Sequence, residues 1–430
     1  MRQAVKTVPA IIGTLTLLTL MATANADNDA RPMPDAYGFP ADHLQLLESL
    51  DRIDYRGMRQ HAWNLWAGIT HQDTRDGVAV FETWYPADNV FSSAPNPPAH
   101  TRSFRTHFEA AKQHPGNKQH SGESLISHVM YNQSARDHIL NNGLNQRATL
   151  ETLNTRFNTQ KTPRFERSIT RFPRDAIAIK MVWWPVKAKV ATLLPVWDGP
   201  YLPRGTDGSH PAMPAEDWPN AVWVLPPGIK VVPARAPRAD VNMRGTVKLN
   251  NFYSFRITRE MLGHLDAAEQ DGFSHVEAGD YAVLLAMHVT TREIHNWVWA
   301  TYWWHDQPDA GSLAEDRPKN VKGIWRHFLM NTAFSIDTPG APDGGAHIAY
   351  NPYIEAKFKN GVQSNCAACH NRASYPALTD HLCGALPITR GSHDFQPTSP
   401  DREGRTKLEF LWSLLIRPEP GPPACLQSGG

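Results

Sequence analysis

Residues 281–304 read YAVLLAMHVTTREIHNWVWATYWW, and this stretch decides the fold class. β-Branched and aromatic residues dominate 281–289 and 294–304, a composition typical of strands on a pleated, half-buried surface. Residues 290–293 between these two runs are polar or charged, and we expect them to form the connection. The stretch therefore predicts a β-hairpin.

Further strands and helices are expected toward the N-terminus. Similar runs predict strands at 78–85, 177–184, 190–197 and 221–225, and prolines interrupt the gaps between the later ones. Apolar residues recur at three- and four-residue steps over 41–69, which predicts helix, with Gly57 as a candidate break. One or two polar helices are expected within 123–157.

Beyond residue 320 the pattern becomes helical. Short helices are expected at 325–331 and 363–374. A final helix is expected to begin at Thr406, where Glu409 completes a capping box. We therefore predict an α+β fold. A β-rich N-terminal region with flanking helices (27–320) is followed by a mainly helical module (321–430).

The overall composition excludes several classes of protein. The chain has 430 residues, with 43 Lys+Arg against 42 Asp+Glu, so its formal net charge is +1. This balance excludes a polybasic nucleic-acid binder and an acidic disordered tail. Apolar residues make up 41%, which is enough for a globular core. Four cysteines are too few for a disulfide scaffold of this size.

Residues 1–26 have the pattern of a secretory signal peptide. Arg2 and Lys6 form a positive n-region, an apolar run follows, and residues 24–26 form an A-x-A cleavage site. The apolar run is shorter than the ~20 residues needed to span a bilayer, which favours cleavage over a retained anchor. We expect export to the periplasm and no transmembrane segment after cleavage.

Two of the four cysteines share one motif. Residues 366–370 read CAACH, and C-x-x-C-H is the attachment signature of c-type haem. In this chemistry Cys366 and Cys369 form thioethers with the haem vinyl groups, and His370 binds the iron as an axial ligand. A thioredoxin-like dithiol needs a βαβ setting, and a structural zinc site needs two further ligands at short spacing. The motif therefore predicts one covalent haem c.

Residues after about 320 resemble a cytochrome c module, in which Cys366, Cys369 and His370 match the haem-binding motif. Longer phrases are similar to a family of uncharacterised bacterial single-haem cytochrome c proteins, namely those at 61–66, 82–85, 297–305 and 351–355. The resemblance implies covalently bound haem but supplies no known activity.

The sequence leaves the identity of the second axial ligand undecided. The commonest class of cytochrome c uses a Met well downstream of the motif, but this chain has no Met after Met330. We prefer Met330 as the distal ligand, although Met also fills gaps in apolar cores. His381 or His393 would give bis-histidine ligation. The third alternative is a five-coordinate iron with an open position.

Two secondary predictions concern the surroundings of the haem. A ligating His usually donates its other N–H to a carbonyl or carboxylate, and the family resemblance places that carbonyl within 373–378, near Pro376. Cys383 and Cys425 lie outside the motif in an exported protein, so they are expected to form a disulfide. A regulatory thiol pair is the alternative.

Three histidines on or beside the predicted hairpin, His288, His295 and His305, could in principle converge on a second metal. They have no tight ligand spacing, so ordinary core or surface roles are the favoured interpretation.

Three functions fit a single covalent haem. The first is periplasmic electron transfer with a redox partner protein or a small-molecule donor or acceptor. The second is a haem-dependent oxidoreductase of peroxidase type, in which the β-rich region would bind substrate. The third is a non-redox haem protein that binds or senses a ligand. The sequence gives no sign of nucleic-acid binding.

Overall fold

The computed structural model of the protein describes residues 30–72, 77–92, 126–198, 215–233, 238–263, 275–335, 348–355, 365–376, 404–416 and 418. It contains both helices and sheets, so the predicted α+β class is confirmed. The expected signal peptide, 1–26, lies outside the described residues.

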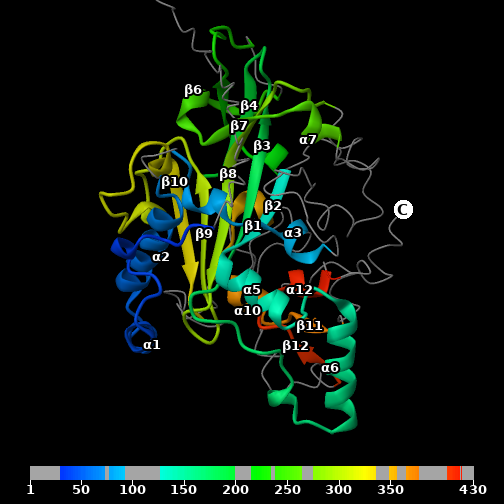
Figure 1. Ribbon diagram of the computed structural model, residues 1–430. Coiled ribbons are helices and arrows are strands. Elements are labelled where there is room, and N and C mark those ends of the chain that lie inside the picture. The colour runs from blue at the N-terminus through cyan, green and yellow to red at the C-terminus, as the bar shows by residue number, and fades with distance from the viewer. Residues whose placement is uncertain are drawn as a thin grey trace, which may run out of the picture.

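A seven-stranded antiparallel sheet runs through the centre of the molecule (Figure 1). In spatial order its strands are β1 (Tyr85–Pro86), β2 (Ile126–Tyr131), β3 (Ile177–Val186), β8 (Tyr281–Thr291), β9 (Val298–Trp304) and β10 (Phe328–Ala333), and β7 (Ser254–Arg256) also pairs with β8. The predicted hairpin is confirmed as β8 and β9, which pair from Ala286 opposite Trp303 to Thr291 opposite Val298.

Two smaller sheets flank this one. Strands β4 (Thr192–Val196), β5 (Asn220–Leu225) and β6 (Asn242–Lys248) form a three-stranded sheet at one end. Strands β11 (Ser374–Tyr375) and β12 (Thr406–Lys407) form a two-stranded ladder at the other. The strands predicted at 177–184, 190–197 and 221–225 are therefore confirmed as β3, β4 and β5.

The helices are mostly short. They are α1 (His43–Asp51), α2 (Tyr55–Ile69), α3 (Ala87–Phe91), α5 (Gln133–Asn141), α6 (Arg147–Thr159), α7 (Arg259–Gly263), α9 (Pro352–Glu355), α10 (Cys366–His370) and α12 (Ser413–Ile416). The two predicted N-terminal helices are confirmed as α1 and α2. The helical conformation is interrupted between them near Ile53, whose φ is 53°. The interruption is not at Gly57, which lies inside α2.

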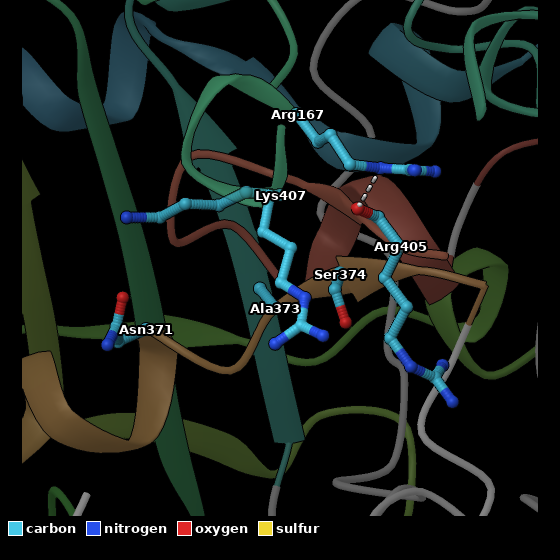
Figure 2. Close-up of a pocket in the computed structure, with 7 residues that line it drawn as sticks. Arg167, Asn371, Ala373, Ser374, Arg405 and Lys407 are labelled. Carbon is cyan, nitrogen blue, oxygen red and sulfur yellow. Dashed lines mark hydrogen bonds between the residues drawn. The ribbon is translucent and has the colours of Figure 1, made fainter. Parts of the chain in front are cut away.

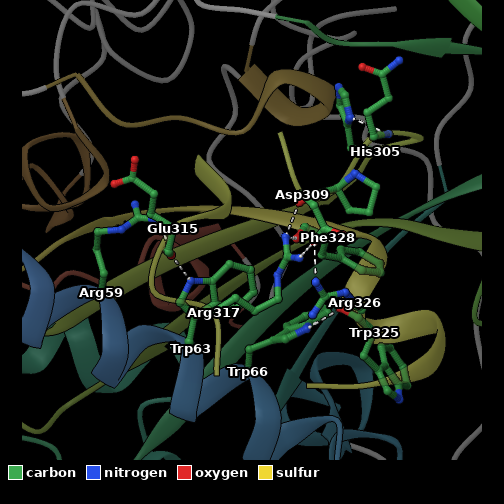
Figure 3. Close-up of polar contacts among 12 residues, drawn as sticks. Arg59, Trp63, Trp66, His305, Asp309, Glu315, Arg317, Trp325, Arg326 and Phe328 are labelled. Atoms are coloured by element: carbon green, nitrogen blue, oxygen red, sulfur yellow. Dashed lines mark hydrogen bonds and ion pairs between the residues drawn. The ribbon is translucent and has the colours of Figure 1, made fainter. Parts of the chain in front are cut away.

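Helix α2 covers one face of the central sheet. Its Trp66 ring stacks on Tyr302 of β9, with 4.4 Å between the ring centroids. The indole N–H groups of Trp63 and Trp66 donate to the carbonyls of Glu315 (3.0 Å) and Trp325 (3.1 Å), in the loop between β9 and β10 (Figure 3). These contacts fix α2 to the sheet through both apolar packing and hydrogen bonds.

The opposite face of the sheet supports the segment that carries the CAACH motif. A second cluster of buried apolar side chains forms there from Ala178 of β3, Trp299 of β9, Ala333 of β10, Ala367 of α10 and Leu408. Successive side chains of a strand point to opposite faces, so Trp299 and Tyr302 on β9 mark the two sides of the sheet. The sheet thus separates the α2 layer from the α10 layer.

Two short predictions before the motif are wrong. Residues 78–85 do not form a strand, because a 3₁₀ turn at Val80–Thr83 precedes the two-residue β1. Residues 325–331 do not form a helix. Instead, a 3₁₀ turn at Gly323–His327 leads directly into β10. Pairing of β10 with residues 299–304 of β9 provides backbone hydrogen bonds that a short isolated helix could not match.

The predicted helix from Thr406 is also wrong. Thr406 lies in β12, and the next turn is interrupted by Glu409 (φ 47°) and Phe410 (φ 68°), so the helix shrinks to α12. The helix expected over 363–374 is present only as α10 among the described residues.

The expected boundary at 320 falls inside the central sheet. β10 comes from the C-terminal side of that position, yet it pairs with β9 over six residue pairs. Described helices after 320 are no longer than five residues, so a mainly helical module is not seen there. Among the described helices, none has the length and apolarity needed to cross a membrane.

Glu293, in the turn of the hairpin, is buried and connects that turn to the N-terminal helices. Its carboxylate accepts from the Ala41 N–H (2.6 Å) and from Thr291 Oγ1 (2.5 Å), and it lies 2.9 Å from His61 Nε2 on α2. Burial alone would raise the pKa of Glu293, but the hydrogen bond and charge of His61, with the other two donors, hold the pKa below its ordinary value.

We predict that Glu293→Gln lowers the free energy of unfolding by about 3 kcal/mol, because it breaks a buried, hydrogen-bonded pair. The folded-state pKa is lower than the unfolded one, so this stabilisation is present above the ordinary pKa of 4.5 and is lost as pH falls through the folded value. Denaturant unfolding of both proteins across this pH range measures the effect. The control, Glu48→Gln, removes an exposed pair with Arg52 and should cost less than about 0.5 kcal/mol. Equal losses in the two variants would contradict the prediction.

Candidate functional site

The CAACH motif forms one turn of helix, α10, whose start is set by Asn365. The Asn365 side chain accepts from the Ala368 N–H (3.0 Å), and its amide donates to the carbonyl of Ser335 (3.2 Å), next to β10. Asparagine is a preferred N-cap because its side chain satisfies a free backbone N–H. The cap therefore fixes where the helix begins and ties it to the central sheet.

The three residues of the motif that carry chemistry lie on one side of α10. Cys366, Cys369 and His370 occupy positions i, i+3 and i+4, which share a helix face. Each is partly exposed, whereas Ala367 and Ala368 between them are buried against the protein. The two thiols and the imidazole therefore lie together on one face of α10, where Cys366 packs against the second apolar cluster and His370 lies against Trp299.

Both thiols are kept protonated. The surrounding protein desolvates them, which raises the pKa of Cys369 to about 11 and raises that of Cys366 further. They are free thiols and are not joined to one another. A redox-active dithiol needs a lowered pKa, so this environment does not favour that alternative. Among the described residues, no group of three or more His, Cys, Asp or Glu side chains could hold a metal ion.

His370 is held as a neutral imidazole with a defined free nitrogen. Its Nδ1 lies 2.7 Å from the carbonyl of Phe410. A carbonyl only accepts, so Nδ1 carries the proton and the lone pair is on Nε2. Burial lowers the pKa of His370 to about 4. Neutral imidazole is the form that binds a metal, and Nε2 is the nitrogen available for it.

The wall beside His370 is formed by the central sheet. The Trp299 ring of β9 lies 4.3 Å from the His370 ring, measured between centroids, at an angle of 43°. Trp299 is almost completely buried. The imidazole is thus fixed by a hydrogen bond at Nδ1 and by an aromatic ring that belongs to the hairpin.

Contacts with residues that are distant in the sequence position the Phe410 carbonyl. Its predecessor Glu409 forms a buried ion pair with Arg292 in the hairpin turn, with 3.1 Å between Oε2 and Nε. The Leu408 N–H donates to the carbonyl of Ala373 (3.0 Å), just after the motif. Positive φ angles at Glu409 and Phe410 turn the backbone, a conformation that non-glycine residues adopt only when their surroundings hold it.

The partner of His370 therefore differs from the sequence-based prediction. The carbonyl was expected within 373–378 near Pro376, but Phe410 supplies it. The antiparallel ladder of β11 with β12 returns the chain to the motif, so a residue 40 positions later reaches the imidazole. Phe410, Glu409 and Arg292 are the residues positioning the motif that the sequence did not indicate. The sequence pattern indicates Glu409 only as part of a capping box with Thr406.

The structure does not bring Met330 to His370. Met330 lies opposite Tyr302 in the pairing of β10 with β9, so it shares the α2 face of the sheet. His370 lies on the other face, against Trp299. The alternative ligands His381 and His393, and the predicted disulfide between Cys383 and Cys425, lie outside the described residues.

The three histidines of the hairpin region do not converge. His305 contacts Asp198 and Asp306 at 3.3 and 3.5 Å. Burial, then the charges of Lys407, Arg292 and Arg171, lower the pKa of His295 to about 4. His288 faces the α10 side of the sheet, where its Nε2 contacts Glu355 Oε1 at 2.5 Å.

A basic pocket lies against the segment that follows His370 (Figure 2). It is lined by Arg164, Arg167, Asn371, Ala373, Ser374, Arg405 and Lys407. Arg167 donates to the carbonyl of Arg405 (3.1 Å) and to Asn158 Oδ1 (2.5 Å), which joins α6 to the chain leading into β12. The pocket contributes positive charge beside the motif, and its hydrogen bonds hold β12 in place.

We predict that Arg292→Met lowers the free energy of unfolding by about 3–5 kcal/mol, because Glu409 would be left buried without its partner. Arg292→Met/Glu409→Leu should recover most of this loss. Denaturant unfolding of the two single variants and the double variant gives the coupling free energy. Arg326→Met removes an exposed ion pair with Asp309 and is the control, with an expected cost below about 1 kcal/mol. Additive effects of the two buried substitutions would show that the pair does not couple these segments.

Comparison with known proteins supplies no further information about the site, because no protein-family model, curated protein or solved structure matches the chain. The functional conclusion accordingly depends on the chemistry of the residues themselves. Those residues are Cys366, Cys369 and His370 on one face of α10, with the Phe410 carbonyl behind the imidazole.

Proposed function

We propose that this protein is an exported c-type cytochrome that carries one covalent haem and transfers electrons in the periplasm. Cys366 and Cys369 would hold the haem, and His370 would bind its iron through Nε2. The observation that supports this most directly is the hydrogen bond from His370 Nδ1 to the Phe410 carbonyl, 2.7 Å long. It orients a neutral imidazole on the same helix face as two protonated thiols.

The donor set fits covalent haem attachment. Each thiol adds across a vinyl C=C bond, with sulfur going to one carbon and hydrogen to the other, so the addition needs no oxidant or reductant. Protonated, unpaired thiols at Cys366 and Cys369 have the form that this addition uses. When bound, haem would supply a one-electron iron centre whose potential depends on the axial ligands and on burial.

The surroundings of His370 favour a stable axial bond. A hydrogen bond from the second imidazole nitrogen fixes the ring and raises the basicity of the ligand. Trp299 limits rotation of the ring from one side. Residues 321–430, together with the sheet face beneath α10, would then form the haem-binding module. Its partner would be a redox protein or a small electron donor or acceptor.

A second candidate function is a haem-dependent oxidoreductase. The observation that favours it is the contact of His288 with Glu355 beside the motif, because a His–carboxylate pair can accept and donate protons. Carbon monoxide binding separates the two functions. An electron-transfer haem with two protein ligands should not respond, whereas an open iron should bind carbon monoxide at once.

We predict that Cys366→Ala/Cys369→Ala carries no covalent haem when it is expressed together with a haem c attachment system. Haem staining after denaturing electrophoresis and acid–organic extraction both measure the covalent fraction. Each single variant keeps one thiol and should retain haem in reduced yield. In the wild type, haem should stay with the polypeptide through both treatments.

Cys383→Ser is the matched control, since it removes a cysteine outside the motif. It should keep its covalent haem even if the loss of the expected disulfide lowers stability by about 2–4 kcal/mol. If acid–organic extraction removes all haem from the wild type, the proposal is wrong.

A further inference from the structure

His288 lies on the same side of the central sheet as the haem motif. It pairs with Thr301 across β8 and β9, and Thr301 is two residues from Trp299, which contacts His370. Residues two apart on a strand share a face and are separated by about 6.5–7 Å. His288 is therefore within one or two side-chain lengths of His370.

A polar row crosses the apolar sheet at this level. Lys180 of β3, His288 of β8, Thr301 of β9 and Asn331 of β10 are aligned by the strand register. In the neighbouring row, Ala178, Trp299 and Ala333 belong to an apolar cluster, and Thr290 is the polar member. In the polar row Thr301 is buried and the other three side chains are half-buried, so these groups carry part of a desolvation cost on a mostly apolar face.

His288 is anchored in the same manner as His370. Its Nδ1 lies 2.8 Å from Thr301 Oγ1, and Asn351 Nδ2 donates to the same hydroxyl at 2.8 Å. A hydroxyl both donates and accepts, so it keeps this contact in either tautomer of His288. Both imidazoles are thus fixed through Nδ1, which directs Nε2 away from the anchor.

Glu355 shows where the Nε2 atom of His288 points. One carboxylate oxygen lies 2.5 Å from that nitrogen, and the other accepts from the Asn351 N–H. The charge of Glu355 also raises the pKa of Cys366, after the larger effect of burial. Glu355 therefore lies near the Cys366 thiol, and His288 Nε2 points toward the same carboxylate.

We propose that His288, through Nε2, is the second axial ligand of the haem iron, and that Glu355 forms a hydrogen bond with this nitrogen when no haem is bound. This inference rests on the proposed function. It gives bis-histidine ligation from a residue upstream of the motif, whereas Met330 is fully buried on the other side of the sheet. Two imidazoles favour a lower reduction potential than a His and a Met.

Optical and electron paramagnetic resonance spectra of the purified holoprotein test the assignment. The wild type should be low-spin in both oxidation states and should not bind carbon monoxide. His288→Ala should become high-spin and bind carbon monoxide, and added imidazole should restore the low-spin spectrum. Met330→Leu is the control and should keep the wild-type spectrum.

His288→Met tests the same assignment without leaving a coordination position of the iron empty, as His288→Ala would. It should show a methionine–iron charge-transfer band and a more positive reduction potential. A wild-type spectrum in His288→Ala, a high-spin wild type, or loss of the low-spin state in Met330→Leu would each overturn the assignment. Covalent haem in these proteins would still support the proposed function, whereas a wild type without covalent haem would overturn both.

Discussion

The ion pair between Arg292 and Glu409 is the constraint on which the candidate site depends. It joins the turn of the central hairpin to the segment after β12 that carries Phe410, whose carbonyl orients His370. The next residue in the turn, Glu293, fastens the same hairpin to the N-terminal helices through His61 and Ala41. Two consecutive charged residues therefore connect both layers of the molecule to the sheet between them.

The hairpin and the helix at the motif could be predicted because both follow from local sequence patterns. Strand composition identified β8 and β9, and the helix expected over 363–374 contains α10. The capping box at Thr406 failed for a long-range reason. Arg292 binds the carboxylate of Glu409, which is then unavailable as a cap. The spacing of Thr406 and Glu409 in the sequence does not reveal that Arg292 competes for the Glu409 carboxylate.

Met330 shows a second limit of local patterns. Its distance from the motif along the chain suited a distal ligand, but β10 pairs with β9 in a register that directs Met330 toward α2. A shift of one residue would have directed it toward α10. The register was not evident from the sequence, because residues 325–331 suggested a helix. The polar alignment of Lys180, His288, Thr301 and Asn331 depends on the same register and was equally hidden.

The separation between His370 and Phe410 also bears on the order in which the protein is assembled. A single helical turn such as α10 has no stability of its own, so the motif gains its conformation only from tertiary contacts. The carbonyl that fixes the imidazole arrives with residues 404–416, after most of the chain has been made. Under the proposed function, the two thiols would be open to haem attachment before that carbonyl is in place. Folding of the final segment would then convert a modified peptide into a rigid coordination site.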